Sequence, residues 1–330
     1  MSKVMTAREA ISRFLRDGDC IALGGFTNNR KPYTLVREII LQRRRDLYVE
    51  GGGAGGDVDM LIGAGCVKAM NNSYIANSGY TQVCRRFRDA IEKGTLPVED
   101  FSLDVQTIVY HAAALGLPYV AVKNMLGSDL EEKWGISEEQ RRALPKLPPK
   151  KHIVQEDPFH PGSLLCLIPT PQIDVAMLHV QKASPDGTCR IEGPQFQDVD
   201  MAIAARRTIV SCEELISDEE IRRMPDQNTI TGLCVDAVVP ARFGAHPSQC
   251  YNYYDYDSRE MWIYDDASRT QEQFDAYVAE YVDACPDHEA YLNKMGAAHL
   301  CSLLVNPQYG YVPGLKRSRE AVFGGEGGQA

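Results

Sequence analysis

The fold class is indicated by one stretch, Cys20-Ile21-Ala22-Leu23-Gly24-Gly25-Phe26, which follows Asp17-Gly18-Asp19 and is closed six residues later by Pro32. An apolar run that ends in two glycines predicts a buried strand followed by a tight turn. After Pro32 the apolar residues recur with the spacing of a helix that buries one face. The stretch therefore predicts a strand, a glycine turn and a helix, in that order.

The same alternation continues along the chain in both spacing and composition. Strands with nearly continuous apolar character, separated by helices, are typical of an open, mainly parallel sheet covered by helices, so we expect an α/β fold. The expected strands are 46–52, 67–77, 118–122, 164–169, 173–181, 207–212 and 235–241, and the expected helices are 58–65, 81–92, 103–115, 199–206, 270–283 and 287–297.

Residues 129–161 break this pattern, because they are charged and rich in proline. We expect them to form an insertion or lid over the sheet and not a second core. Since no linker separates two cores, residues 1–320 are interpreted as a single domain. The glycine-rich end, 321–330, is expected to be a flexible tail.

The composition excludes several classes of function. The chain has 330 residues, of which 45 are acidic and 35 basic, and a formal net charge of -10, which argues against nucleic-acid binding. No apolar run is long enough to cross a membrane, and the N-terminus has no signal-peptide core. Ten scattered cysteines, without metal-ligand spacing, favour reduced thiols, no metal site and a cytoplasmic location.

Several polar residues near glycine turns are candidates for the site. The string 51–56 matches the GxGxxG pattern, but no acidic residue lies between Asp59 and Asp89 to hold a ribose, so a dinucleotide site is not expected. Glu50 ends an expected strand and could expose a nucleophilic carboxylate, although a solvated strand end explains it as well. His246 lies in a polar turn and could contact a ligand or be structural.

The stretch 17–32 resembles the first signature of class I coenzyme A transferases, in its α-type subunit, with Arg30 where the family usually has glycine. Residues 183–187 and the element Phe196-Gln197-Asp198-Val199-Asp200 are also similar to this family. The words GGAGGDVDMLIG, WGIS and GAHPSQCY look like the glutaconate branch, and the resemblance runs over most of the chain.

The resemblance implies a ping-pong exchange of CoA between an acyl-CoA and a dicarboxylic acid. It also implies that the catalytic glutamate belongs to a homologous B-type partner, because the Ser-Glu-Asn-Gly signature of that partner is absent here. This chain would then be half of a heteromeric enzyme, α2β2 or a multiple of it. CoA would be a substrate, and no tightly bound cofactor is expected.

The expected site residues follow from the turns that end the strands. Gly24, Gly25 and Phe26 are expected to line the acyl pocket and to stabilise an oxyanion through their amides. Expected contacts of the substrate are Asn77, Ser78, Gly79, Gln197 and His246. Glu50 remains an alternative nucleophile within this chain.

Two other functions stay open at this point. The same fold could carry a CoA-thioester hydrolase or a ring-opening hydrolase, or the chain could be a CoA-binding subunit without catalysis. The residues do not determine which dicarboxylic acid is used or how Arg30 alters the pocket.

Overall fold

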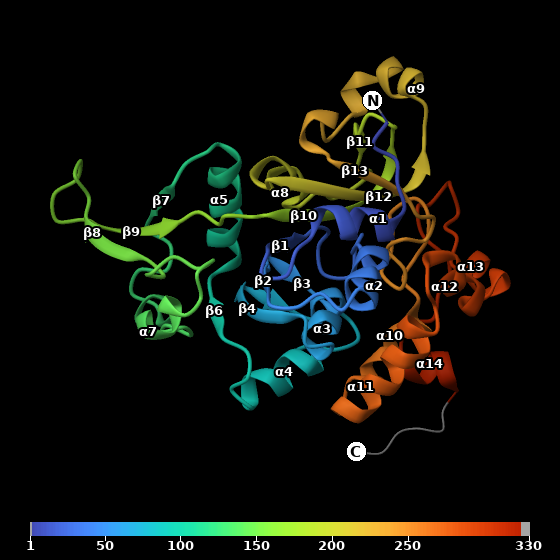
Figure 1. Cartoon of the computed structure of the whole chain (residues 1–330), viewed down its shortest axis with the longest axis horizontal. Helices are drawn as coiled ribbons and strands as arrows, with labels where there is room; N and C mark the ends of the chain where they lie inside the picture. The colour runs from blue at the N-terminus through green and yellow to red at the C-terminus, as the bar shows by residue number, and fades with distance from the viewer. Residues whose placement is uncertain (1, 325–330) are drawn as a thin grey trace.

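The computed structural model describes residues 2–324, and a parallel sheet forms its centre (Figure 1). The strands, in spatial order, are β13 (Ala237–Pro240), β12 (Arg207–Leu215), β10 (Val175–Ala183), β1 (Cys20–Leu23), β2 (Leu47–Glu50), β4 (Val67–Asn72) and β6 (Val98–Asp100). Each pair of neighbours is parallel, and only the short β11 (Cys189–Arg190) joins β10 in the antiparallel direction. The expected open, mainly parallel sheet is therefore confirmed.

Helices cover both faces of this sheet. Alternate residues of a strand point to opposite faces, so Ile21 and Leu23 join the apolar core on one side while Cys20 and Ala22 face the other. The first side is covered by α1 (Ala7–Phe14), α2 (Tyr33–Leu41) and α3 (Gly56–Gly63). The second side is covered by α5 (Leu103–Ala114), α8 (Asp198–Ala204) and the apolar residues of segment 136–147.

An arm made of residues 119–169 projects from the main sheet on the side away from the C-terminal helices (Figure 1). Its three antiparallel strands have the order β7 (Tyr119–Val122), β9 (Leu164–Pro169), β8 (Ile153–Glu156), and it also holds α6 (Asp129–Glu132) and α7 (Glu138–Arg142). The expectation that 118–122 and 164–169 continue the main sheet was wrong, because these segments pair with each other. Tyr119 is 53% exposed, so the outer face of the arm is open to solvent.

The remaining elements pack around the sheet and at its edges. They are β3 (Gly53–Ala54), β5 (Tyr74–Ile75), α4 (Arg85–Glu92), α9 (Asp218–Arg223), α10 (Ser258–Ala267), α11 (Gln271–Val278), a short π-helix (Ala279–Asp283), α12 (His288–Met295), α13 (Ala297–Ser302), α14 (Arg319–Phe323) and two short 3₁₀ helices (Pro225–Gln227 and Gly232–Cys234). α10 was not expected from the sequence. Of the expected tail 321–330, residues 321–323 belong to α14 and 325–330 lie outside the described residues. No helix within 2–324 has the length and apolar character needed to cross a membrane.

Candidate active site

The carboxyl end of β1 is the point where the order of the strands reverses. β2, β4 and β6 follow on one side of β1, whereas β10, β12 and β13 extend the sheet on the other. Open parallel sheets bind ligands at such a reversal, outside the carboxyl ends of the strands. Gly24, Gly25 and Phe26 come directly after β1, so they lie where a ligand is expected.

The amides of these three residues are all engaged within the chain. The Gly24 N–H donates to the carbonyl of Met177 (2.9 Å), that of Gly25 to Asp198 Oδ1 (2.9 Å), and that of Phe26 to the carbonyl of Asn29 (3.0 Å). An oxyanion needs a donor without another acceptor. In this conformation these amides therefore do not form the expected oxyanion hole. They fix the turn through hydrogen bonds within the chain.

Two buried ion pairs hold that turn in place. Arg30, at a φ of 55°, directs its Nη2 to Asp198 Oδ2 (2.9 Å), and Lys31 Nζ lies 3.3 Å from Asp57 Oδ2. The side chains of all four residues are at most 2% exposed. Lys31 Nζ also donates to the Gly24 carbonyl (3.3 Å), while Asp198 accepts the Gly25 amide, so the turn is held from both sides.

Two glycines after β2 allow a close approach of backbone to this turn. A Cβ at Gly53 would lie 2.5 Å from a ring carbon of Phe26, and one at Gly52 would lie 2.2 Å from Gln197 Oε1. Phe26 also packs on Phe196 with 4.4 Å between ring centroids. A side chain at Gly53 would collide with the Phe26 ring, and one at Gly52 would force the Gln197 amide to move. Gln197 and Phe26 thus both lie against the segment that follows β2.

Gln197 presents one free polar atom there. Its Nε2 donates to Thr107 Oγ1 (3.0 Å), whereas its buried Oε1 has no partner among the described residues. An unpaired buried acceptor is costly unless water or a ligand donates to it. The expected role of Gln197 in substrate binding is compatible with this position and stays a prediction.

In the turn Asn77-Ser78-Gly79, the first residue is buried and has a structural role, whereas the other two are accessible. Asn77 is 1% exposed and accepts the Gly56 amide through Oδ1 (2.8 Å), so its side chain joins two loops. Ser78 and Gly79 are exposed, and Ser78 Oγ exchanges a hydrogen bond with Tyr74 OH (2.5 Å). Asn28 Nδ2 donates to the Ser78 carbonyl (2.8 Å), which places this turn beside the turn after β1.

His246 is in the interior and not at the surface of the site. Its side chain is fully buried, Nδ1 bonds to Tyr291 OH (2.8 Å), and Nε2 bonds to Asp257 Oδ2 (2.8 Å). Burial lowers the pKa of His246, which favours its neutral form. Direct contact with a substrate is therefore not supported. Its loop acts through the backbone instead, because the carbonyl of Gln249 accepts the Arg30 amide (2.8 Å).

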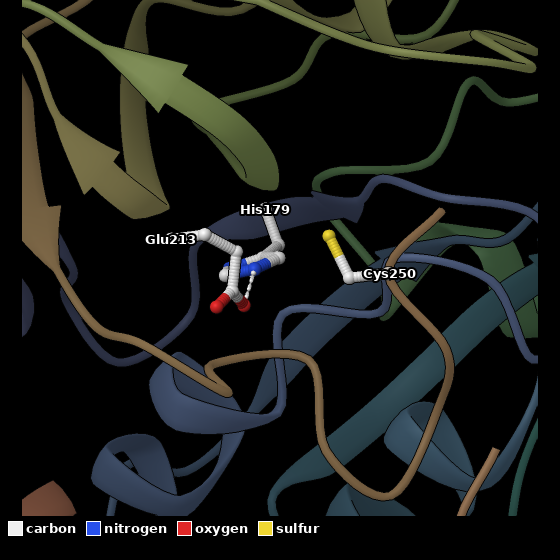
Figure 2. Close-up of side chains that lie close together, drawn as sticks. All are labelled: His179, Glu213 and Cys250. Carbon is white, nitrogen blue, oxygen red and sulfur yellow. Dashed lines mark hydrogen bonds and ion pairs between the residues drawn. The ribbon is translucent and has the colours of Figure 1, made fainter. Parts of the chain in front are cut away.

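A second buried polar cluster was not found from the sequence. Figure 2 shows His179 and Glu213 joined by a hydrogen bond (2.7 Å), with the Cys250 thiol apart from them. Glu213 also accepts Tyr254 OH (2.6 Å) and the Phe243 amide (2.7 Å), so its oxygens are occupied. The cluster ties β10 and β12 to the loop 241–254. The only signal in the sequence is a histidine and a glutamate within apolar strands.

Glu50 lies beneath the arm and is 8% exposed. Asn71 Nδ2 donates to its Oε1 (2.8 Å), and burial raises the pKa of the carboxyl group to about 7. The expectation that the Glu50 carboxylate is exposed at a strand end is therefore wrong, because the residue is buried. Glu50 faces a cavity under the arm and not the open edge of the sheet.

The fold and the site together define an α/β protein with an open parallel sheet and, at its reversal point, a glycine turn fixed by buried ion pairs. The family model for coenzyme A transferase matches residues 4–241, well over half of the chain. The chain belongs to the coenzyme A transferase family, and the resemblance expected from the sequence is confirmed.

Named relatives cover nearly the whole chain. The A subunit of glutaconate CoA-transferase from Acidaminococcus fermentans is 57% identical over 94% of this chain and 97% of its own length. The A subunit of 3-oxoadipate CoA-transferase from Pseudomonas knackmussii is 32% identical over 89% and 99%, respectively. The crystal structure of glutaconate coenzyme A-transferase from A. fermentans superposes with a TM-score of 0.93, at 56% identity over 94% of this chain and 98% of that one.

Proposed function

We propose that this chain is the A subunit of a CoA-transferase that moves CoA between an acyl-CoA and a dicarboxylic acid, with glutaconate as the first candidate. The observation that carries the proposal is 57% identity over 94% of the chain to a protein of that name, together with a TM-score of 0.93 to the solved enzyme. The identity of the dicarboxylic acid is a more specific proposal than the transfer of CoA itself. CoA acts as a substrate, and no tightly bound cofactor is proposed.

We propose further that a B-type partner supplies the nucleophilic glutamate. The turn after β1 has two carboxylates beside it, Asp57 and Asp198, and both are neutralised by buried ion pairs. Glu50 is buried under the arm. The family resemblance implies that the nucleophile belongs to another chain, and the burial of these three carboxylates is compatible with that. We propose a heteromer of α2β2 type or a multiple of it, located in the cytoplasm.

The chemistry needs a carboxylate and a dry site. The partner's glutamate attacks the thioester carbonyl, CoA thiolate leaves, and an acyl-glutamyl anhydride forms. The thiolate then attacks the glutamyl carbonyl and releases the acyl group as a carboxylate, which leaves a glutamyl-CoA thioester. The acceptor carboxylate reverses the two steps. Water must be excluded, because it would hydrolyse the anhydride and lose the bond energy.

This chain would shape one wall of the pocket. We assign the apolar wall to Phe26 with Phe196, and the carboxylate contacts to the exposed Ser78 hydroxyl and the Gly79 amide. Gln197 Oε1 would accept a hydrogen bond from an N–H or O–H group and not contact a carboxylate directly. Gly24 and Gly25 would act by letting the backbone approach closely, and not through free amides. Residues 1–320 would work as one domain, with 129–161 as its lid.

A trapping experiment tests the assignment of the nucleophile. The complex purified from its source is incubated with glutaryl-CoA and reduced with borohydride, which converts a glutamyl thioester to an alcohol. Peptide mass mapping then locates the modified glutamate. Modification of a co-purifying partner, with this chain unmodified, is the expected result. Modification of Glu50 would reverse the assignment, and a Glu50→Gln variant that still permits labelling of the partner is the matched control.

A further inference from the structure

His246, Asp257 and His299 bring three ligand atoms together among the C-terminal elements. Nε2 of His246 lies 2.8 Å from Asp257 Oδ2, and Nε2 of His299 lies 2.5 Å from the same oxygen. All three atoms are within 4.8 Å of one another. Two imidazole nitrogens and a carboxylate oxygen that converge in this way are a donor set typical of transition-metal sites. The proposed CoA exchange uses none of these groups.

Three separate elements supply these atoms, so their convergence is a property of the fold. His246 belongs to the loop between β13 and α10, Asp257 caps the start of α10, and His299 lies in α13. An ion at this point would join the loop to both helices. The same loop supports the turn after β1, because the carbonyl of Gln249 accepts the Arg30 amide (2.8 Å).

Hydrogen bonds on the opposite side of each group fix two of the three ligands in orientation. Asp257 Oδ1 accepts the amides of Arg259 (3.1 Å) and Glu260 (3.2 Å), which leaves Oδ2 for the two histidines. Nδ1 of His246 bonds to Tyr291 OH (2.8 Å), and this contact directs Nε2 toward Asp257. Metal-binding histidines are oriented in the same way, through the ring nitrogen that does not bind the metal.

A buried carboxyl group without a partner lies one helical turn away. Glu260 is 6% exposed, and its Oε2 has no hydrogen-bond partner within residues 2–324. Burial raises the pKa of Glu260, and the charge of Asp257 adds to this effect, which indicates that the two carboxyl groups are near each other. Arg37 is also buried, but it stacks on the Tyr291 ring (3.6 Å from the guanidinium carbon to the ring centroid) and forms no ion pair with Glu260 in the described chain. A buried carboxylate is costly without a cation or a donor, and water on a neighbouring metal ion would be such a donor.

The donor set and its exposure favour zinc. The side chains of His246 and Asp257 are at most 1% exposed, whereas that of His299 is 27% exposed, so an ion can enter from the side of α13. Ca²⁺ and Mg²⁺ prefer oxygen ligands alone, which disfavours both of them here. Zn²⁺ binds imidazole nitrogen and carboxylate oxygen at about 2.0–2.2 Å, so the three atoms would move apart by less than about 1 Å to surround it.

We propose that His246, Asp257 and His299 form a structural site for a divalent transition-metal ion, with Zn²⁺ as the first candidate and a water molecule as the fourth ligand. Glu260 would accept a hydrogen bond from that water. The expectation of no metal site rested on the cysteines, and none of them is a ligand here. The proposal goes beyond the proposed function, because the ion would fix the loop and would take no part in the transfer of CoA.

Metal binding by the full chain tests the proposal. The chain is treated with a chelator, dialysed into metal-free buffer and titrated in separate samples with Co²⁺ and with Zn²⁺. We expect one ion per chain and the visible absorption of four-coordinate Co²⁺ without a thiolate charge-transfer band. Zn²⁺ should raise the melting temperature, because an ion that binds only the folded state stabilises it.

Two variants and a control locate the ion. His299→Gln removes a ligand and should weaken Zn²⁺ binding by more than about 100-fold, whereas Glu260→Gln removes only the acceptor of the bound water and should weaken it about 10- to 100-fold. Glu260→Gln also removes a buried charge without a partner, so the metal-free variant should stay folded. His160→Gln is the matched control, because His160 also pairs with an aspartate, Asp157 at 2.9 Å, but its side chain is 75% exposed. It should leave the affinity unchanged.

Three results would overturn the proposal. If no ion is retained and micromolar Zn²⁺ does not raise the melting temperature, the three side chains form a hydrogen-bonded group only. A thiolate band in the Co²⁺ spectrum would place the ion at a cysteine. An affinity that His299→Gln lowers no more than His160→Gln does would place the ion elsewhere on the chain. An affinity that His299→Gln lowers and Glu260→Gln does not would refute the assignment of Glu260.

Discussion

Replacement of Arg30 by methionine tests whether the turn after β1 is held by its buried ion pair. The Arg30 guanidinium bonds to Asp198 (2.9 Å) and also donates to the carbonyls of His179 (2.9 Å) and Pro194 (2.7 Å). Arg30→Met leaves a buried carboxylate with one remaining donor, the Gly25 amide, and leaves two carbonyls short of a donor.

The expected cost follows from these contacts. Removing one partner of a buried pair costs about 3–5 kcal/mol, because the other charge stays in the interior. The thioether recovers part of the apolar packing, so we expect a loss of about 3–4 kcal/mol in the free energy of unfolding. Urea titration followed by circular dichroism at pH 7 measures this value.

Arg43 offers a matched control within the same chain. It also has a positive φ (54°) and an ion pair, to Asp283 at 2.8 Å, but its side chain is 57% exposed. Arg43→Met should cost less than about 1 kcal/mol. In a double-mutant cycle, Asp198→Asn should recover part of the loss in the Arg30→Met background. Equal losses for the two arginine variants would refute the idea that the buried pair holds the turn.

Three further predictions concern titration, capping and substrate affinity. Burial raises the pKa of Glu50 from 4.5 to about 7, so the folded state binds the proton more tightly and stability falls as pH rises from about 4.5 to 7. Between pH 5 and pH 8 the free energy of unfolding should fall by about 3 kcal/mol less in Glu50→Gln than in the wild type. Urea titrations at the two pH values measure this difference. Asp257→Asn should cost at least about 2 kcal/mol, because Asp257 binds both His246 and His299 and caps α10. Ser78→Ala should raise KM for the dicarboxylate about two- to tenfold with little change in kcat.

Each of these has a result that would contradict it. Identical pH dependence of the wild-type chain and Glu50→Gln would mean that the carboxyl group is hydrated in solution. An Asp257→Asn variant as stable as the wild type would show that the two histidines find other partners. A fall in kcat without a change in KM for Ser78→Ala would place that hydroxyl at the reacting carbonyl and not at the distant carboxylate.

Most of the main sheet could be predicted because its signals are local. Apolar runs that end in glycine at Gly24 and Gly51 mark strand ends directly, and helical spacing marks the helices between them. The arm could not be separated from the sheet in this way. Strand 164–169 is as apolar as a core strand, and only its pairing with 119–122, through contacts distant in sequence, shows that it belongs elsewhere.

The site was less accessible to sequence reasoning for the same reason. The turn after β1 was located, but the use of its amides depends on Asp198, which is far along the chain. His246 lies in a polar turn, yet Asp257 and Tyr291 place it in the interior. Arg30 stood out as a departure from the family pattern, and its partner became visible only in the fold.

The central position of β1 has a consequence for the synthesis of this protein. β1 is made first and pairs on one side with β2 shortly afterwards, whereas its other neighbour, β10, begins at Val175. While the chain emerges from the ribosome, the second edge of β1 has unpaired backbone groups and apolar side chains until β10 is complete. Such an open edge can pair with another chain. Chaperone occupancy should consequently be highest on nascent chains from which β10 has not yet emerged.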